Sequence, residues 1–380
     1  MTAAADANAP WRWVDLGAVD GATMVNVFVA LAGTVGAGRS PPTVVVLYPE
    51  RPFANVGFHQ EAEREVDVPF CRARGIPIVR RVVGGGAILD GPWEHDYMAI
   101  VPTGAPGTAA GVPEFYETYL TPVRAALARL GVPAERSGVN DLAARGRKVS
   151  ANGAMQLEGS WVLVGDLLLD LDVAAMSRVL RVPDEKFRGK LATGMAGWLT
   201  SVRAETGRLP SRAEASRVLR EEFARGLGVT FVPGDLTPEE TTGLGALRAA
   251  RSRDEWTFRK DRAHPNLRGA PEEGRAVKIA NGAVLARADR KAGKLVRVTL
   301  LYRNGAVEEV EFSGDFFTHP FDGKLAELET ALAGSPVDGP ALRSSVAAWL
   351  DRTGVRLLGA TADDLAAAVV AAAAVPVTSS

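Results

Sequence analysis

Two short stretches of this 380-residue chain combine glycine with basic side chains in a pattern that suits the binding of an anion. Residues 79–91 have the sequence VRRVVGGGAILDG, in which Arg80 and Arg81 come shortly before three consecutive glycines, Gly84 to Gly86. Bare backbone that turns tightly can point successive N–H groups at a phosphate, and a neighbouring arginine adds positive charge. A hairpin turn or a β-bulge is the ordinary alternative, and the glycines alone do not decide between these possibilities.

The second stretch is GRKVS, residues 146–150, which places Lys148 just after a glycine. Lysine is a compact point charge that suits a phosphoryl group in transfer, whereas the planar arginine fork suits a static anion. A lysine in a solvated loop is the commoner case for any single position. Asn140 and Asp141, a few residues upstream, fit either a binding role or a simple turn.

Composition limits the classes of protein to which such a site can belong. The hydrophobic content of 47% and the length of 380 residues predict a globular protein of two domains or three small ones. The net charge of −1 predicts no overall attraction to nucleic acid or to an anionic membrane. The only cysteine, Cys71, excludes an internal disulfide, and the four scattered histidines give no pair at ligand spacing, so we expect no structural metal. We expect a cytoplasmic location, because the first ten residues lack a signal-peptide pattern and the apolar segment 365–375 is too short to span a membrane.

Hydrophobic spacing and end signals predict the elements of the first 250 residues. Capping residues Ser211 with Glu214, and Thr237 with Glu240, open two helices, the first of which should end at Gly226. The other predictions are helices at 24–33, 61–74 and 113–130, and extended segments at 43–48, 76–83, 87–89 and 161–171.

The remainder of the chain has a different pattern. The polar stretch 255–274 suggests a domain boundary, and two Asn-Gly pairs, at 281–282 and 304–305, predict hairpins. Helical patterns follow at 324–332, 341–350 and 361–374. We therefore predict a disordered tail at 1–10, a large domain at 11–262 and a small α+β domain at 263–376.

The order of these motifs resembles that of the lipoate-protein ligases, the acyl-adenylating branch of a fold shared with biotin ligases. RRVVGGGAIL is followed by VNDLAARGRKVSANG and then by the strand GDLLLDLD, while Gln60, Glu65 and Val66 match the segment upstream. Residues 182–202 are similar to the stretch after the catalytic core, and EFSGDFFTHP at 311–320 resembles the accessory domain that some members carry. The resemblance implies an α+β fold, in which 11–262 is a catalytic domain with a mixed or antiparallel sheet and 263–376 is the accessory domain.

The resemblance also implies a reaction, in which ATP and Mg²⁺ activate lipoate as lipoyl-AMP and an acceptor lysine then displaces AMP. The expected partners are lipoyl-domain proteins, namely E2 subunits of 2-oxoacid dehydrogenases and the glycine cleavage H protein, with no nucleic acid and no membrane. Lys148 is the implied catalytic cation. The positions that match the family's ATP-binding run are Arg81, Gly86, Ala87, Ile88, Leu89 and Lys148, and those that match its lipoate and adenylate contacts are Arg80, Val83, Gly84, Gly85, Asn140, Asp141 and Lys148.

The chain departs from the family at the acyl end of the implied site. Val83, Asp90 and Val164 stand where the family commonly has polar or histidine residues, which leaves the acyl substrate open among lipoate, octanoate and others. Related octanoyltransferases carry the acyl group on a cysteine, in one type near the position of Asn140, and Cys71 on a predicted helix is a poor candidate for this role. An acyltransferase that works without ATP and a non-catalytic lipoyl-binding or acyl-binding protein remain the alternatives.

Overall fold

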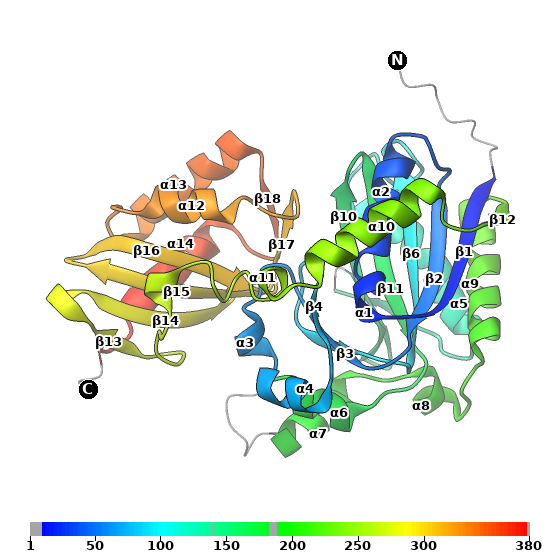
Figure 1. Ribbon diagram of the computed structural model, residues 1–380, viewed down its shortest axis with the longest axis horizontal. Coiled ribbons are helices and arrows are strands. Elements are labelled where there is room, and N and C mark those ends of the chain that lie inside the picture. The colour runs from blue at the N-terminus through cyan, green and yellow to red at the C-terminus, as the bar shows by residue number, and fades with distance from the viewer. Residues whose placement is uncertain (1–9, 139, 182–187, 378–380) are drawn as a thin grey trace. The chain divides into compact units, whose positions relative to one another are not determined.

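The computed structural model describes residues 10–138, 140–181 and 188–377 (Figure 1). The chain forms two compact units, and the second combines the C-terminal residues with two short segments from the N-terminal half. Unit 1 comprises Met1–Asn55, Val66–Arg81 and Ile88–Arg253, and unit 2 comprises Val56–Glu65, Val82–Ala87 and Asp254–Ser380. Residues 1–9 of the predicted tail lie outside the described residues, and the predicted boundary at residue 262 stays a prediction.

A six-stranded sheet forms the centre of unit 1. Its strand order is β10-β11-β6-β2-β1-β12, with β1 parallel to β2 and β12 and the remaining neighbours antiparallel. The strands are β1 (Trp11–Val19), β2 (Thr43–Pro49), β6 (Glu94–Pro102), β10 (Asn152–Leu157), β11 (Ser160–Leu168) and β12 (Phe231–Pro233). This mixed sheet confirms the predicted fold class and the strands predicted at 43–48 and around Trp161.

Helices cover both faces of this sheet. Helices α5 (Val112–Arg129) and α9 (Arg212–Leu227) share the largest core with one face, whereas α2 (Val27–Gly36) packs on the other and carries α10 (Pro238–Arg251) outside it (Figure 1). Burial on two sides explains why β2 has a continuous β-branched run instead of alternating polar residues. The predicted helices in these regions are confirmed, including the complete capping box at Thr237.

The end of α9 corrects one prediction. The helix continues through Gly226 to Leu227 and ends at Gly228, whose φ of +68° suits glycine. Gly226 serves a different purpose, because a Cβ there would lie 2.8 Å from Cγ of Pro122 on α5. This glycine lets the two helices approach closely, and nothing in the local sequence distinguishes that use from a helix stop.

Two further predictions were wrong in extent. The helix predicted at 61–74 is two helices, α3 (Ala62–Glu65) and α4 (Val68–Arg74), because Pro69 fits only a first turn and the Asp67 side chain caps that new start. The strand predicted at 76–83 is only β4 (Ile78–Arg80), since its partner β3 (Phe53–Val56) is itself four residues long. On the other side, β3 pairs with β5 (Ile88–Asp90).

The remaining elements of unit 1 are short. A separate sheet consists of β7 (Glu135–Ser137), β8 (Asp141–Ala144) and β9 (Arg147–Ser150). The helices are α1 (Gly21–Met24), α6 (Val173–Val179), α7 (Arg188–Trp198) and α8 (Val202–Thr206). The segment 182–202 therefore contributes α7 and the start of α8, and its residues 182–187 lie outside the described part of the chain.

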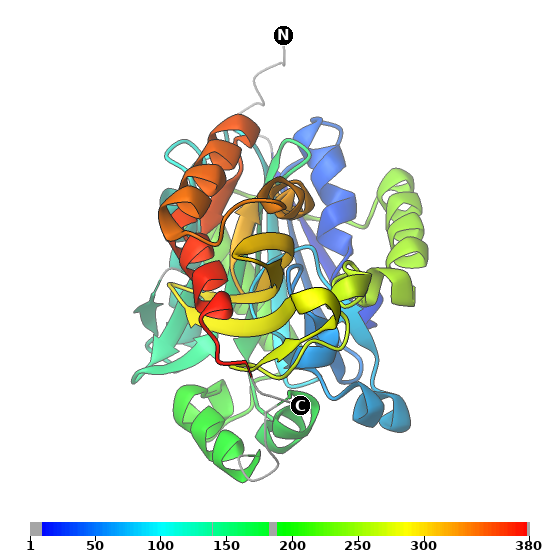
Figure 2. The ribbon, with the colours of Figure 1, turned by 90° about the vertical axis from the view of Figure 1, so that its left-hand side faces the viewer.

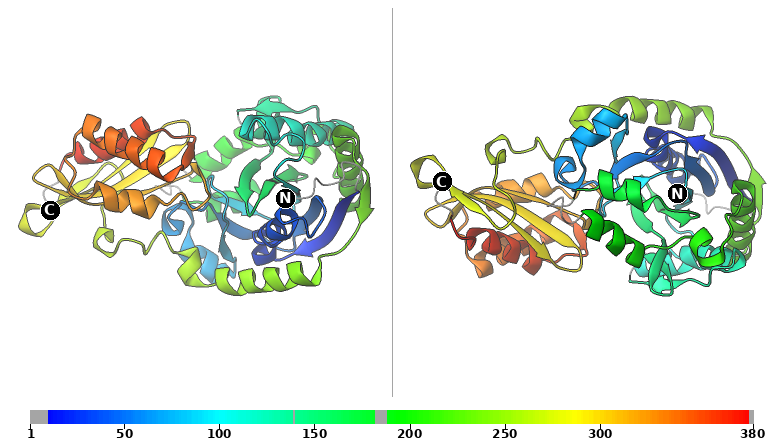
Figure 3. Two further views of the ribbon diagram at one scale, coloured as in Figure 1. Left: turned by 90° about the horizontal axis from the view of Figure 1, so that it is seen from above. Right: turned by 90° about the horizontal axis from the view of Figure 1, so that it is seen from below.

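Unit 2 contains an antiparallel sheet of four strands with helices on one face (Figures 2 and 3). The strands are β13 (Ala276–Lys278), β14 (Val284–Lys291), β15 (Leu295–Arg303) and β16 (Ala306–Gly314), and the helices are α12 (Leu325–Leu332), α13 (Gly339–Thr353) and α14 (Ala362–Ala373). Short elements complete the unit, namely α3, α11 (Asp254–Thr257), β17 (Phe317–His319), β18 (Arg356–Leu358) and two 3-10 turns at Pro265–Leu267 and Ala280–Gly282.

The predicted α+β arrangement of this part of the chain is confirmed. Asn304 and Gly305 adopt φ values of 51° and 76° between β15 and β16, as a tight hairpin requires. Among the helices of the described ranges, none combines the length and the hydropathy needed to cross a bilayer.

Candidate active site

Arg81 stands where the chain leaves β4 and enters the glycine loop, residues 82–87. Its guanidinium donates to the backbone oxygen of Asn55 at 3.0 Å, and the amide of Asn55 donates to Oδ2 of Asp90 at 2.7 Å. Burial lowers the pKa of Arg81 to about 10, and the charge of Asp90 acts in the opposite direction. Three elements of unit 1 thus meet at one connected polar group.

The neighbouring predicted residues differ in their exposure. Arg80 is buried with 1% of its surface exposed, whereas Ile88 at the start of β5 is exposed and Leu89 is buried. The ATP contacts expected at Ile88 and Leu89 stay predictions.

The glycine loop belongs to unit 2 and is restricted by the protein's own backbone. Gly85 has a φ of +92°, a conformation that other residues rarely adopt. A Cβ on Gly84 would lie 2.6 Å from the carbonyl oxygen of Phe316, whereas a Cβ on Gly86 would meet nothing within 4 Å. Two of the three glycines are therefore required by local geometry, before any ligand is considered.

Lys148 lies on β9 in unit 1 and forms an ion pair with a residue predicted beside it. Its Nζ is 2.7 Å from Oδ2 of Asp141 on β8, and 37% of the lysine side chain is exposed. The Asn140 amide donates to the backbone oxygen of Asn152, and the backbone oxygen of Lys148 accepts from Thr200 N at 2.8 Å. The structure thus brings Asn140, Asp141 and Lys148 together, with the lysine side chain partly exposed.

Four buried carboxyl groups lie together near these residues. Asp90, Glu94, Asp96 and Asp166 are each at most 8% exposed, and Asp166 on β11 lies directly opposite Asp96 on β6. Burial disfavours ionisation of all four groups, and neighbouring carboxylates disfavour it further for Glu94, Asp96 and Asp166. The pKa of each group is accordingly raised, to about 6 for Asp90 and to about 7 for Asp166.

Asp166 connects the two predicted clusters of unit 1. Burial is the main cause of its raised pKa, the charge of Asp90 raises it further, and the charge of Lys148 lowers it. The Asp166 carboxylate also accepts a hydrogen bond from Ala151 N at 2.9 Å. Asp90 at the end of β5 and Lys148 on β9 therefore both act electrostatically on one carboxyl group.

Sequence reasoning missed this carboxyl cluster, although a signal was present. Glu94 and Asp96 are separated by one residue in a strand, so they must share a face. Their neighbour Asp166 comes from a segment seventy residues away, and only the register of β6 and β11 places it there. The sequence offers no comparable local signal for that pairing.

Asn152 is a second residue that sequence reasoning missed. Its side-chain oxygen accepts from the hydroxyl of Tyr97, and its side-chain nitrogen donates to Ser150 Oγ at 3.1 Å. A Cβ on Gly165 would lie 2.1 Å from the Asn152 side-chain oxygen. Gly165 therefore leaves room for a polar network that reaches Ser150 at the end of β9, which explains why β11 contains a glycine.

Cys71 has the properties of a packed thiol. It lies on α4 with 0% exposure, and burial raises its pKa to about 11. A thiol that is protonated and shielded is a poor nucleophile. On β11, Trp161, Leu163 and Leu167 form part of the main hydrophobic core of unit 1.

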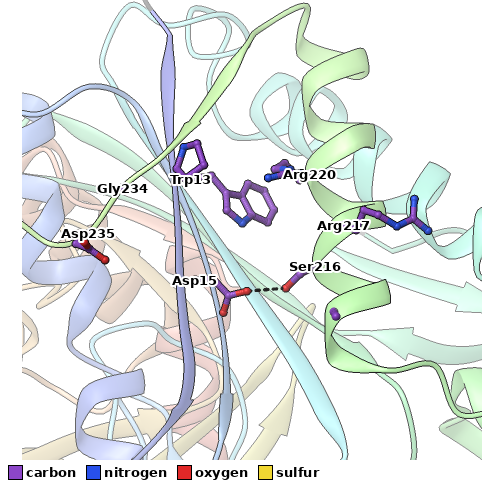
Figure 4. Close-up of a pocket in the computed structure, with 9 residues that line it drawn as sticks. Trp13, Asp15, Ser216, Arg217, Arg220, Gly234 and Asp235 are labelled. Carbon is purple, nitrogen blue, oxygen red and sulfur yellow. Dashed lines mark hydrogen bonds between the residues drawn. The ribbon is translucent and has the colours of Figure 1, made fainter.

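A cavity of about 550 Å³ opens elsewhere in unit 1, between β1, β12 and α9 (Figure 4). Trp13, Asp15, Ser216, Arg220 and Asp235 are among its lining residues. In Figure 4, Asp15 and Ser216 point toward each other and are joined by a hydrogen bond of 3.1 Å. None of the predicted site residues lines this cavity, so it is distinct from the Lys148 cluster.

Comparisons with known proteins define the class to which this fold and these residues belong. The family described as the lipoyl protein ligase A/B catalytic domain matches residues 26–224. Octanoyltransferase LipM of Kyrpidia tusciae is 30% identical over 272 residues, covering 66% of this chain and 99% of that protein. LipM of Symbiobacterium thermophilum is 31% identical over 274 residues, covering 66% of this chain and 98% of that protein.

The chain belongs to the lipoyl protein ligase A/B family, which confirms the predicted resemblance. It is accordingly an enzyme of the group that contains lipoate ligases and octanoyltransferases. Solved structures share its fold, among them a bipartite lipoate protein ligase of Thermoplasma acidophilum, with a TM-score of 0.59 at 22% identity over 66% of this chain and 97% of that one. LipL1 of P. falciparum, solved with lipoate, has a TM-score of 0.63 at 10% identity and covers 90% of this chain and 94% of its own.

Proposed function

We propose that this protein ligates lipoate to a lysine of an acceptor lipoyl domain, using ATP and passing through lipoyl-AMP. In the first step the lipoate carboxylate attacks the α-phosphorus of ATP and pyrophosphate leaves. In the second step the acceptor amine attacks the acyl carbonyl and AMP leaves, forming an amide. Mg²⁺ enters with ATP as its complex, and the acceptors are lipoyl domains of E2 subunits or the H protein.

The state of Cys71 is the observation that carries this proposal. A transferase that moves an acyl group through a thioester needs an accessible thiol of low pKa. The chain has one cysteine, and that residue is buried with its pKa raised to about 11. Activation of a free acid by ATP needs no protein thiol, so the ligase route is compatible with this chain.

Lys148 supplies the positive charge that the first step requires. Negative charge accumulates on the α-phosphate as the carboxylate attacks, and a fixed cation lowers the barrier. The Lys148 side chain is partly exposed and its amine lies 2.7 Å from Asp141, which gives it the charge and a fixed orientation for this role. Arg81 and the glycine loop are proposed to hold the remaining phosphates and the acyl chain.

Octanoyl transfer without ATP is the second candidate, because the LipM relatives are octanoyltransferases and each is covered almost completely. This route predicts modification of an acceptor domain from an octanoyl carrier protein in the absence of ATP. It also requires a nucleophile other than Cys71. A non-catalytic protein would bind the acyl ligand without releasing AMP.

One experiment separates these functions. An acceptor lipoyl domain is incubated with the protein, ATP, Mg²⁺ and one free acid, namely lipoate, octanoate or biotin. In a second incubation the acyl donor is an octanoyl carrier protein and ATP is left out. The mass of the acceptor domain is then measured. An increase in the mass of the acceptor domain that requires a free acid and ATP supports the ligase function. An increase in mass with the octanoyl carrier protein and no ATP overturns the ligase function. No gain in either case, together with tight acyl binding, identifies a binding protein.

Substitution of Lys148 tests its role directly. Lys148→Ala should lower lipoate-dependent ATP–pyrophosphate exchange by roughly 10²- to 10³-fold, the usual loss for one fixed electrostatic contact. Arg147→Ala is the matched control, because Arg147 is on the same strand, is 35% exposed and pairs with Glu205 at 2.6 Å. Unchanged exchange in Lys148→Ala, in a folded protein, would refute the assigned role.

A further inference from the structure

The glycine loop and residues 56–65 pack against the C-terminal module, defined here as Asp254–Ser380. His59 is central to this packing, with only 2% of its surface exposed. Its ring is stacked on that of Phe316, with centroids 5.0 Å apart and an interplanar angle of 12°. Its backbone oxygen accepts from Gly314 N at 3.2 Å. His59 is therefore held by both its side chain and its backbone.

A short chain of hydrogen bonds continues from the His59 ring into the module. Nε2 lies 2.9 Å from Oγ1 of Thr318, and the Thr318 hydroxyl donates to the backbone oxygen of Phe321 at 2.8 Å. Since the single hydroxyl proton goes to Phe321, the Thr318 oxygen accepts from Nε2–H. This contact therefore fixes both the orientation and the protonated nitrogen of the ring.

Phe316 contacts the glycine loop as well as His59. Its carbonyl oxygen would be 2.6 Å from a Cβ on Gly84, so the two backbones touch. In addition, Phe58 N donates to the oxygen of Val83 at 3.1 Å. The loop is thus contacted both by the residue next to His59 and by the residue on which the His59 ring stacks.

The residues that flank His59 are anchored independently. The Phe58 ring packs edge-on against Phe321 at 5.1 Å. On the other flank, Glu61 accepts from Ser313 Oγ at 2.8 Å and from Arg287 at 3.2 Å. Loss of the His59 ring would therefore leave the segment attached while removing the ring's contacts with Phe316 and Thr318.

We propose that the C-terminal module positions the glycine loop, and that His59 is the positioning residue through which Phe316 and Thr318 hold it. The loop is then presented in one conformation before substrate arrives. A preorganised loop binds its ligand more tightly, because the apparent affinity is proportional to the fraction of molecules whose loop is in the binding-competent conformation. The kinetic consequence rests on the proposed function, whereas the conformational consequence does not.

Amide hydrogen exchange of residues 82–89 in the full-length protein without substrate tests the conformational part. Thr318→Val removes the hydroxyl with little change of shape, and exchange in this peptide should become at least several-fold faster. His59→Ala should have a larger effect. Thr318→Ser keeps the hydroxyl and should resemble the unmodified protein.

A matched control removes a comparable contact elsewhere in the module. The Tyr302 hydroxyl donates to the backbone oxygen of Ala373 at 3.1 Å, far along the chain from the loop. Tyr302→Phe should therefore leave exchange of residues 82–89 unchanged. Faster exchange in this control as in Thr318→Val would show general loosening of the module and overturn the assignment to His59.

Kinetics test the consequence for catalysis. In Thr318→Val the KM for ATP or lipoate should rise roughly tenfold while kcat changes little, because saturating substrate selects the competent loop. If the unmodified protein shows no lipoate-dependent ATP–pyrophosphate exchange, the proposed function is refuted, but the amide hydrogen exchange result still stands. Unaltered exchange of residues 82–89 in both His59→Ala and Thr318→Val would refute the positioning role itself.

Discussion

Replacement of Asp166 by asparagine should stabilise the protein at alkaline pH more than at acidic pH. The folded protein raises the pKa of this carboxyl from 3.8 to about 7, chiefly by burial. A raised pKa means that the folded state holds a proton that the unfolded chain releases. The stability contribution is therefore present below pH 3.8 and is lost as the pH rises through about 7.

The size of this change in unfolding free energy depends on how much of the interval between the unfolded pKa of 3.8 and the folded pKa of about 7 the experiment covers. Each unit of pKa difference corresponds to about 1.4 kcal/mol, and the interval from pH 5 to pH 7 contributes about 3 kcal/mol. Asparagine keeps an oxygen that can accept from Ala151 N but cannot ionise. The change in unfolding free energy caused by Asp166→Asn should therefore be more favourable at pH 8 than at pH 5 by about 3 kcal/mol.

Urea unfolding at pH 5 and pH 8, at equal ionic strength and followed by circular dichroism, measures this difference. Asp170→Asn is the control, because Asp170 is 36% exposed and pairs with Arg203 at 2.9 Å. The control should change stability by under about 1 kcal/mol at either pH. An Asp166→Asn effect that is the same at both pH values, within about 0.5 kcal/mol, would refute the argument from burial.

Two further predictions concern Cys71 and His264. Cys71→Ala should cost roughly 1 kcal/mol of stability for the lost sulfur and leave activity within about twofold, and loss of all activity in the folded variant would show that the thiol reacts. Hydrogen bonds to Glu329 and Glu309 raise the pKa of His264 to about 9, so its stabilisation is present below pH 6.5 and is lost as the pH rises through about 9. The melting temperature should accordingly fall as the pH rises over this interval, and it should fall less in His264→Gln. An equal dependence of melting temperature on pH in both proteins would contradict the role given to His264.

Elements with strong local signals could be predicted from the sequence. Helix α5, the capping box at Thr237 and the hairpin at Asn304 and Gly305 depend on residues that are close together in the chain. Capping hydrogen bonds and left-handed turn residues act over three or four positions, so a short window contains the necessary information.

Predictions failed where a contact between distant segments decided the outcome. Gly226 was expected to end α9, yet it lies within the helix and accommodates Pro122 of α5. Glycine has several structural uses, and its neighbours in sequence do not distinguish them. The failure at 61–74 was different, because Pro69 and Asp67 were visible in the sequence and signalled the break.

The candidate site shows the same division. The residues predicted for it come from the order of the sequence motifs, and the ion pair of Lys148 with Asp141 forms within one local sheet. The carboxyl pair of Asp96 and Asp166 could not be foreseen, because their separation depends on the register of two strands. A shift of one residue would move every side chain of a strand to the other face.

By itself the sequence determined the family of this protein, the residue types that can carry its chemistry, and the helices and turns whose signals are local. Tertiary structure alone decided that the glycine loop packs on Phe316 of the C-terminal module, and that four carboxyl groups share one buried region. The reason is physical. Burial and the juxtaposition of charges depend on which distant segments meet, and no short window of sequence contains that information.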